Sequence, residues 1–319
     1  MSETNTTPPT PTPTPATAPA VKPRPTLPKL TKLKAHDPKT AEPSKPKILI
    51  FGRPGVGKTW WALSFPQVYY IDTEGGADLA HYTDRLKKAG GVYMGPDDGS
   101  NDLGVITEQV KALATEAHPY KTVVIDSMSK PFNTAISEEA TRLGEKDQFG
   151  ASKKPAIANI RRLITWLDKI DMNVILICHE KQEWGLLNGE RAQTGVTFDC
   201  YEKLEYELHL CLRADKRGPE RFAVVRKSRL LGFPDGSEFK LDFAEFAQRY
   251  GKETIEKPAK LLVLATPVEV EEVTRLLDIV KVSDEDREKW FKKANVEAWN
   301  EMTKDQIGGV IGWLNKRMK

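Results

Sequence analysis

The sequence has few cysteines and no long hydrophobic run, and each shortage excludes a class of protein. The three cysteines, Cys178, Cys200 and Cys211, are an odd and sparse set. Such a set cannot form a disulfide framework, and it lacks the paired spacing of a zinc site. The sequence contains no stretch of about 18 apolar residues, which is the length that a membrane-spanning helix needs. The first residues also lack the apolar segment of a secretory signal. We therefore expect a cytoplasmic protein with no membrane partner.

The sequence also has no large excess of positive or negative charge. The 48 Lys and Arg residues against 45 Asp and Glu residues leave a formal charge of only +3. Because the chain is so close to neutral, any binding to nucleic acid has to come from a local patch rather than from bulk charge. The sequence also has no G-x-S-x-G motif, so a hydrolase triad has no support.

Composition divides the chain into four segments. Residues 1–46 contain 12 of the 22 prolines, with seven basic and three acidic residues. Because proline removes backbone donors, this segment is predicted to be a disordered Pro/Thr-rich tail. It is either a solvated linker or a basic arm that helps to hold a polyanion or a neighbouring subunit. Residues 47–250 are predicted to form the core, 251–265 a linker, and 266–319 a small helical domain with caps at three positions, Thr266, Ser283 and Thr303.

Short apolar runs indicate the architecture of the core. Residues 68–71, 122–125 and 173–177 are continuous apolar runs, which are typical of strands buried on both faces of a parallel sheet. Residues 157–170 have helical spacing instead. Alternating strands and helices predict a doubly wound, mostly parallel α/β sheet. Three later runs predict a β-rich C-terminal edge: Leu204–Leu212, Arg221–Arg226 and Phe239–Asp242.

The most informative motif is a complete G-x-x-x-x-G-K-[ST] loop between an apolar strand and a helix. Its residues, with the one that follows, are Gly52, Arg53, Pro54, Gly55, Val56, Gly57, Lys58, Thr59 and Trp60. In this motif the glycines let backbone N–H groups surround the phosphates of a nucleotide. Lys58 supplies a charge for the β- and γ-phosphates, and the Thr59 hydroxyl can bind Mg²⁺. The loop therefore predicts a nucleotide-binding site.

Two carboxylates follow core strands at the positions that nucleotide hydrolysis requires. Asp126 ends the run T-V-V-I-D, where it can bind Mg²⁺ together with Thr59. Glu74 follows the second strand, at the sheet edge where α/β proteins bind ligands, and it can orient the attacking water. The residues alone do not separate this role for Glu74 from that of an exposed loop acid.

Three further polar residues are candidates for sensing or stabilising the γ-phosphate. His179 follows the apolar run at residues 173–178, and a surface histidine in a loop is the alternative. Lys227 and Arg229 alternate along an extended segment, so both lie on one face. They can act across a subunit boundary, as arginine fingers do, although spacing alone favours a solvated charge pair on an edge strand.

The order of these motifs resembles the RecA-like ATPase core. The matching stretches are GRPGVGKT, YYIDTEGGA, TVVIDS, VILICHEK and VVRKSRLLGF, spread over residues 47–245. The resemblance implies an Mg²⁺-dependent ATPase with ATP as its nucleotide and Glu74 as its catalytic base. It places His179 where the family has a glutamine that couples the nucleotide to DNA. It also implies that Lys227 and Arg229 act in trans within a homo-oligomer.

The resemblance also extends to DNA binding. Residues 143–155 and 181–197 match the DNA-contacting loops of the family by position, and each mixes glycine, basic residues and an aromatic residue. That mixture suits binding of single-stranded DNA without sequence preference, whereas loop length alone fits two mobile surface loops equally well. The stretch KILIFGRPGVGKTWWALSFPQVYYIDTEGGA is similar to small phage ATPases of single-strand annealing and recombination. The resemblance does not extend to the large N-terminal oligomerisation domain of the family, and we expect the disordered Pro/Thr-rich tail in its place.

Three hypotheses for the function follow. The first is an ATP-dependent single-stranded-DNA-binding recombination protein of the phage RecA-like type, which anneals or pairs strands in the cytoplasm of the host cell. The second is a helicase or loader motor on the same core, for which the sequence shows no additional helicase module. The third is a nucleotide-gated adaptor that uses its C-terminal helices to dock a single-strand-binding protein.

Overall fold

The computed structural model describes residues 43–148, 150–187 and 189–318. The predicted tail therefore lies outside the described residues except for its last four positions. Within the described part, no helix is both long enough and apolar enough to cross a membrane.

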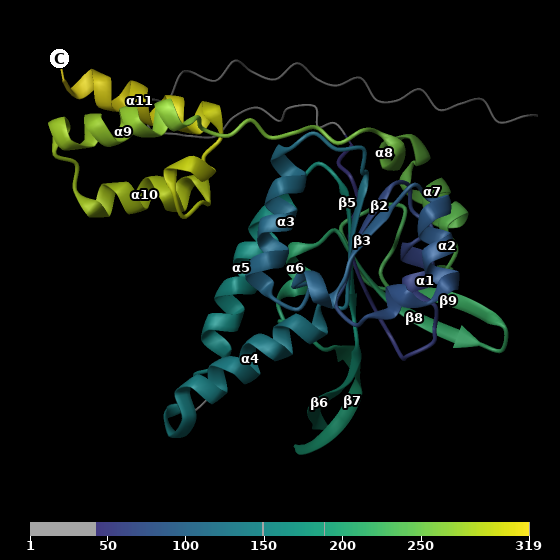
Figure 1. Ribbon diagram of the computed structural model, residues 1–319. Coiled ribbons are helices and arrows are strands. Elements are labelled where there is room, and N and C mark those ends of the chain that lie inside the picture. Colours follow the sequence, from purple (N-terminus) through teal and green to yellow (C-terminus); the bar gives the residue numbers. More distant parts are fainter. Residues whose placement is uncertain (1–42, 149, 188, 319) are drawn as a thin grey trace, which may run out of the picture. The chain divides into compact units, whose positions relative to one another are not determined.

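An eight-stranded sheet lies at the centre of the described chain (Figure 1), in the order β10-β9-β8-β1-β5-β4-β2-β3. The six strands from β8 to β3 are parallel, and β9 and β10 add an antiparallel edge. The fold is thus the predicted doubly wound, mostly parallel sheet. Its strands are β1 (Lys47–Phe51), β2 (Val68–Asp72), β3 (Val92–Met94), β4 (Thr122–Asp126), β5 (Asn173–Cys178), β8 (Leu210–Arg217), β9 (Glu220–Ser228) and β10 (Glu238–Lys240).

Helices cover both faces of the sheet, as Figure 1 shows. One face carries α1 (Lys58–Ala62), α2 (Ala80–Lys88), α7 (Phe243–Tyr250) and α8 (Lys252–Glu256). The other carries α3 (Leu103–Thr115), α4 (Ser129–Leu143), α5 (Lys153–Lys169) and α6 (Leu204–Glu207). Three short 3-10 helices lie in the connections: η1 (Gly76–Asp78), η2 (Pro96–Asp98) and η3 (Gly144–Lys146).

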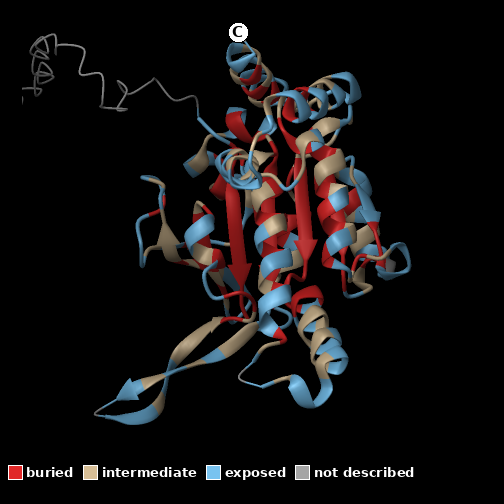
Figure 2. Ribbon diagram, turned by 90° about the vertical axis from the view of Figure 1, so that its left-hand side faces the viewer, coloured by how far each residue is buried: buried red, intermediate tan, exposed pale blue. Residues whose placement is uncertain are grey.

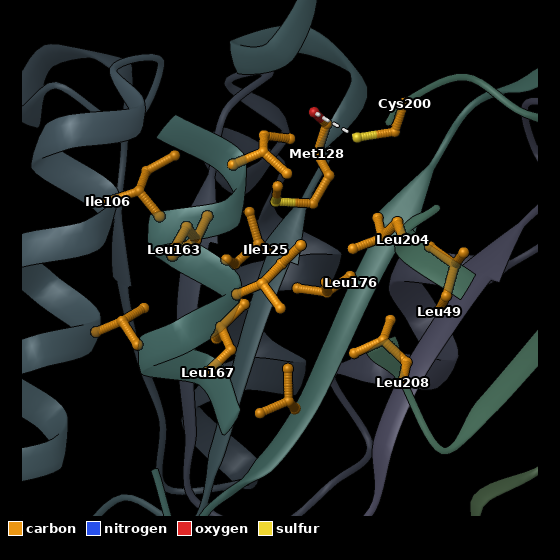
Figure 3. Packing of buried hydrophobic residues seen from close by; sticks show 14 of the residues in the cluster. Leu49, Ile106, Ile125, Met128, Leu163, Leu167, Leu176, Cys200, Leu204 and Leu208 are labelled. Atoms are coloured by element: carbon orange, nitrogen blue, oxygen red, sulfur yellow. Dashed lines mark hydrogen bonds between the residues drawn. The ribbon is translucent and has the colours of Figure 1, made fainter. Parts of the chain in front are cut away.

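Each face of the sheet has its own buried core, because successive residues of a strand point to opposite faces. Leu49 of β1 packs on the α3–α5 face, together with Ile125 and Leu176 (Figure 3). Its neighbours Ile48 and Ile50 pack on the α1–α7 face. Both faces are covered, which explains why the core strands are uninterrupted apolar runs.

One predicted strand is wrong. The run Leu204–Leu212 is not a single strand, because residues 204–207 form α6 and β8 begins only at Leu210. Leu204 and Leu208 lie one helical turn apart, and both are buried in the α3–α5 core. A helical turn brings these two leucines to the same face, whereas an extended strand would also have placed the more exposed Tyr206 there.

The C-terminal helices have a core of their own. They are α9 (Pro267–Val280), α10 (Asp284–Ala294), η4 (Trp299–Glu301) and α11 (Lys304–Arg317). Thr266, Ser283 and Thr303 cap the three α-helices, as predicted, because each side chain accepts a hydrogen bond from a backbone N–H of the first turn. The tryptophans also pack as predicted: the rings of Trp290 and Trp313 meet edge to face, 5.0 Å apart.

A buried lysine joins β1 to the end of α5. Lys47 Nζ donates to the carbonyl oxygens of Leu167, Asp168 (2.8 Å) and Ile170 (3.2 Å), in the last turn of α5 and just beyond it. These carbonyls have no partner within the helix, so Lys47 acts as its C-terminal cap. Burial lowers the pKa of Lys47 to about 8, and the carboxylates of Asp168 and Asp171 oppose the shift only in part.

We predict that Lys47→Met lowers the free energy of unfolding by about 1–3 kcal/mol at pH 7, because buried carbonyls lose their donor. The pKa of Lys47 is lower in the folded than in the unfolded chain, so the unfolded chain binds more protons between about pH 8 and 10.5. The contribution of Lys47 to stability therefore increases with pH across this window. Urea denaturation at pH 7 and pH 9.5 should show the gap between wild type and Lys47→Met widening, with exposed Lys88→Met as the control. A gap that is constant with pH would contradict the assignment.

Candidate functional site

The candidate site lies at the carboxyl ends of β1, β5, β4 and β2. Register aligns these ends: Phe51 pairs with Cys178, and Asp126 lies beside both Ile177 and Asp72. The chain segments that follow the four strands therefore start side by side. Asp126 is the last residue of β4, and the segments after β1, β2 and β5 contain the phosphate loop, Glu74 and His179.

The phosphate loop depends on glycine at several positions. Gly52 has φ 151° and approaches β8 so closely that a Cβ would lie 2.5 Å from the Ala214 carbonyl oxygen. Gly57 has φ 95°, in the left-handed region, directly before α1. Lys58 Nζ folds back and donates to the carbonyls of Gly52 (2.8 Å) and Arg53 (3.0 Å). Burial lowers the pKa of Lys58, and the charges of Asp126 and Glu74 oppose that shift.

Thr59 and Asp126 form the candidate magnesium pair. The Thr59 hydroxyl donates to Asp126 Oδ2 over 2.5 Å, and the Tyr70 hydroxyl donates to the same oxygen over 3.4 Å. Burial raises the pKa of Asp126 to about 6. The Thr59 hydrogen bond and the Lys58 charge oppose this shift, while the Glu74 charge adds to it.

The oxygens of Thr59 and Asp126 fit Mg²⁺, which prefers hard oxygen ligands and completes its shell with phosphate oxygens and water. The described residues include no cluster of three or more His, Cys, Asp or Glu side chains that could hold a metal ion. Thr59 and Asp126 would supply two oxygens to a magnesium ion, and the phosphate oxygens of a bound nucleotide could supply others.

Glu74 is held in place by a network at the ends of β2, β4 and β5. Ser127 Oγ donates to Glu74 Oε1 over 2.8 Å, and His179 Nε2 lies 2.5 Å from the same oxygen. Asp72 fixes the turn behind Glu74, because its carboxylate accepts hydrogen bonds from the backbone of Glu74, Gly75 and Ala77. Glu74 is also 41% exposed on its side chain, so it can meet a water molecule. The structure thus brings Glu74, Asp126 and His179 together with the phosphate loop.

His179 also begins a projecting hairpin. Its backbone N–H donates to Ser129 Oγ over 2.9 Å, and β6 (Glu180–Leu187) starts at the next residue. The hairpin returns through β7 (Glu190–Phe198) and covers most of the second predicted DNA loop. Glu180 Oε1 lies 3.6 Å from Arg53 Nε of the phosphate loop. The base of the hairpin therefore contacts both Glu74 and the phosphate loop.

Lys227 and Arg229 are not near the phosphate loop of their own chain. Ser228, between them, pairs with Leu210, which in turn pairs with Ile48 near the start of β1. This is the opposite end of the sheet from the loop. Lys227 donates to the carbonyl of Leu208, and Arg229 donates to that of Tyr206. Their role in a neighbouring subunit stays a prediction.

Sequence reasoning missed Arg221, at the other end of β9. A Cβ built on Gly57 would lie 2.8 Å from both Cδ and Nε of Arg221, so this side chain crosses the phosphate loop. Within residues 43–318, apart from Phe149 and Asn188, its guanidinium has no hydrogen-bond or ion-pair partner. No motif marks Arg221. Arg213 of β8 pairs with Phe51, the last residue of β1, and β8 continues for four more residues. The chain then turns back into β9, so Arg221 lies beyond the end of β1, beside the phosphate loop.

Comparisons with known proteins agree with the phosphate loop. A family described as an AAA domain (AAA_24) matches residues 44–238, which is more than half of the chain. No curated protein matches the sequence. The structure is similar to a crystal structure of the RadB recombinase, with 21% identity over 61% of this chain and 86% of that chain and a TM-score of 0.40.

A second similar structure is an ATPase from the type III secretion system of pathogenic bacteria. Its identity is 11%, over 86% of this chain and 80% of that chain, with a TM-score of 0.37. The family match covers β1 to β9, and thus every strand that carries a site residue. The chain therefore belongs to the AAA-domain family AAA_24, and it is a P-loop ATPase.

Proposed function

We propose that this ATPase binds single-stranded DNA and uses ATP to anneal or pair strands in recombination, as a phage RecA-like protein would. One observation carries the proposal: the β6–β7 hairpin starts directly after His179, and His179 contacts Glu74. Figure 2 shows the hairpin projecting from the buried sheet with mostly exposed and intermediate residues. A surface that could bind DNA is thus continuous with the group that would activate water.

The hairpin has the chemistry for binding single strands. Trp184 is 53% exposed, and the Arg191 guanidinium lies 5.5 Å from the centre of its ring. An exposed aromatic face can stack on a base, and an adjacent cation can meet a phosphate. Arg226 anchors the hairpin from β9 by donating to the Val196 carbonyl and to Glu183. The anchor would keep Trp184 in a defined position.

The turn between α4 and α5 offers a second contact. It contains part of the first predicted DNA loop, with η3 and the exposed Lys153 and Lys154 at the start of α5. Figure 1 shows this turn and the hairpin projecting at the same end of the sheet. Both projections carry basic residues, so a strand that follows both of them could meet a cation on each.

The site residues divide the chemistry among them. Lys58 would exchange its two carbonyl partners for phosphate oxygens, and Glu74 Oε1 would accept a proton from the attacking water. Mg²⁺, when held by Thr59 and Asp126, neutralises phosphate charge. His179 shares Oε1 of Glu74, so a change in the hydrogen bonding of that oxygen would reach the hairpin through the histidine. Arg229 and Lys227 would complete the site of a neighbouring copy in a homo-oligomer.

The first prediction of this proposal concerns turnover. Glu74→Gln keeps the size of the side chain but removes the proton acceptor, so ATP hydrolysis should fall at least about 100-fold while ATP affinity changes little. Phosphate release and equilibrium ATP binding measure the two effects. Lys58→Ala, as a comparison, should lose binding as well. Turnover close to that of wild type in Glu74→Gln would remove Glu74 from the role of base.

The second prediction concerns DNA. Trp184→Ala should weaken binding of a single-stranded oligonucleotide by roughly 1–3 kcal/mol, or about 5- to 150-fold, because one stacking platform is lost. The matched control is Tyr93→Ala, which removes another exposed aromatic residue at the far edge of the sheet. Fluorescence anisotropy at fixed salt measures both variants. Equal affinities for wild type and Trp184→Ala would argue against the hairpin as a DNA surface.

DNA-dependent assays separate the three hypotheses. ATPase stimulation by single strands together with annealing of complementary oligonucleotides supports the proposal. Unwinding of a tailed duplex would instead indicate a helicase or loader. If the protein does not bind single-stranded DNA and its ATPase rate is the same with and without DNA, the recombination role is wrong. The third hypothesis, an adaptor for a single-strand-binding protein, would then replace it.

The third prediction concerns the subunit boundary. If Arg229 acts on a neighbouring nucleotide, Arg229→Ala should hydrolyse ATP poorly, and mixing it with Lys58→Ala subunits should restore part of the activity. A mixed boundary is intact where the Arg229→Ala subunit supplies the phosphate loop and the Lys58→Ala subunit supplies Arg229. Activity is measured across mixing ratios, with the assembly state checked by sedimentation. Intact assembly without any restored activity would contradict a role in trans.

A further inference from the structure

We propose that a pocket formed by Trp60, Arg85 and Arg221 holds the nucleoside of the bound nucleotide. The inference rests on the ATPase part of the proposed function and not on DNA binding. It assigns the half of the nucleotide that the phosphate-loop motif leaves undefined.

The first argument is direction. β5, β4 and β2 lie on one side of β1, and they bring His179, Asp126 and Glu74 to the site. These groups fix the side on which the terminal phosphate would lie. In a nucleoside triphosphate, the nucleoside is at the opposite end of the phosphate chain. With the β-phosphate in the loop, the nucleoside would point away from Glu74 and toward the side of β8, β9 and β10.

The second argument is space. A cavity of about 280 Å³ lies on that side, directly beyond the phosphate loop. Its lining comes from α1 and α2 on one wall, and from the start of β9 with the chain after β10 on the other: Trp60, Ser64, Arg85, Arg221, Lys240 and Asp242. The volume is close to the lower end of small-molecule sites. The cavity combines aromatic surface with several hydrogen-bonding groups, as a base and a ribose require.

The third argument is an unsatisfied donor. Arg85 stacks on Trp60, with its Cζ 4.0 Å from the centre of the ring, and one of its terminal nitrogens donates to Ser64 Oγ. Its Nε is buried and has no hydrogen-bond partner within residues 43–318, apart from Phe149 and Asn188. A buried donor without a partner is unfavourable, so an acceptor on a ribose or base would relieve that deficit.

The fourth argument is the continuity between loop and pocket. Arg221 lies over Gly57 of the phosphate loop and also lines the cavity. A cation in that position would meet the phosphates nearest the nucleoside. Trp60 follows Thr59 directly and is 44% exposed, so it offers a stacking face one residue beyond the loop. The larger face of a purine would use this platform best.

The test compares two ligands, ATP and inorganic tripolyphosphate, each with Mg²⁺, by isothermal titration calorimetry on the full chain. Wild type should bind ATP at least about tenfold more tightly than tripolyphosphate. Trp60→Ala and Arg85→Gln should weaken ATP about 5- to 20-fold while affinity for tripolyphosphate stays within about twofold. Arg221→Ala should weaken both ligands. Lys87→Gln, an exposed change on the same helix as Arg85, should weaken neither.

Several outcomes separate this pocket from the proposed function. Trp60→Phe keeps an aromatic face and should recover most of the ATP affinity, which a general folding defect would not allow. If Trp60→Ala and Arg85→Gln affect ATP and tripolyphosphate equally, or affect neither, the pocket is wrong while the ATPase stands. If wild type binds neither ligand, the ATPase and the pocket are both overturned.

Discussion

The in-register parallel pairing of β1, β5, β4 and β2 is the constraint on which the site depends. Phe51 lies level with Cys178, and Asp126 lies level with Asp72. The chain therefore leaves these four neighbouring strands at the same end of the sheet. A shift of one residue in any pairing would turn the following side chains to the other face of the sheet. The two buried cores on either side hold this register, since each strand residue has a fixed face to fill. Packing and chemistry are therefore specified by the same residues.

Much of this arrangement can be predicted from the sequence, and the exceptions have physical causes. The central strands are predictable because both of their faces are buried, which leaves uninterrupted apolar runs. The phosphate loop, Asp126 and His179 are predictable because each directly follows such a run, and Glu74 because it lies three residues after one. Leu204–Leu212 is misread, because a run that mixes apolar and polar residues fits a helical turn as well as a strand. Arg221 has no local signal at all, because its position depends on how far β8 extends beyond β1.

The cations of the chain differ in how they are satisfied. Lys47 and Lys227 donate to backbone carbonyls of their own chain, and so does Lys58. Lys47 is buried beside a helix end, and its bonds are structural. Lys58 makes the same kind of bond at an edge that a ligand can reach, so its partners can be replaced by phosphate oxygens without leaving the ammonium unpaired. Arg221 crosses the same loop at Gly57, and it has no partner to give up among the residues that the structure describes.

The hairpin has a mechanical property that follows from its attachment. No linker separates His179 from β6, so the first peptide of the strand moves whenever the histidine moves. Eight extended residues span roughly 26 Å at about 3.3 Å per residue. With that lever arm, a rotation of about 10° at the base would sweep the tip through roughly 4–5 Å, close to the spacing of neighbouring strands in a sheet. A small rotation beside Glu74 would therefore become a displacement of about 4–5 Å at the tip of the hairpin.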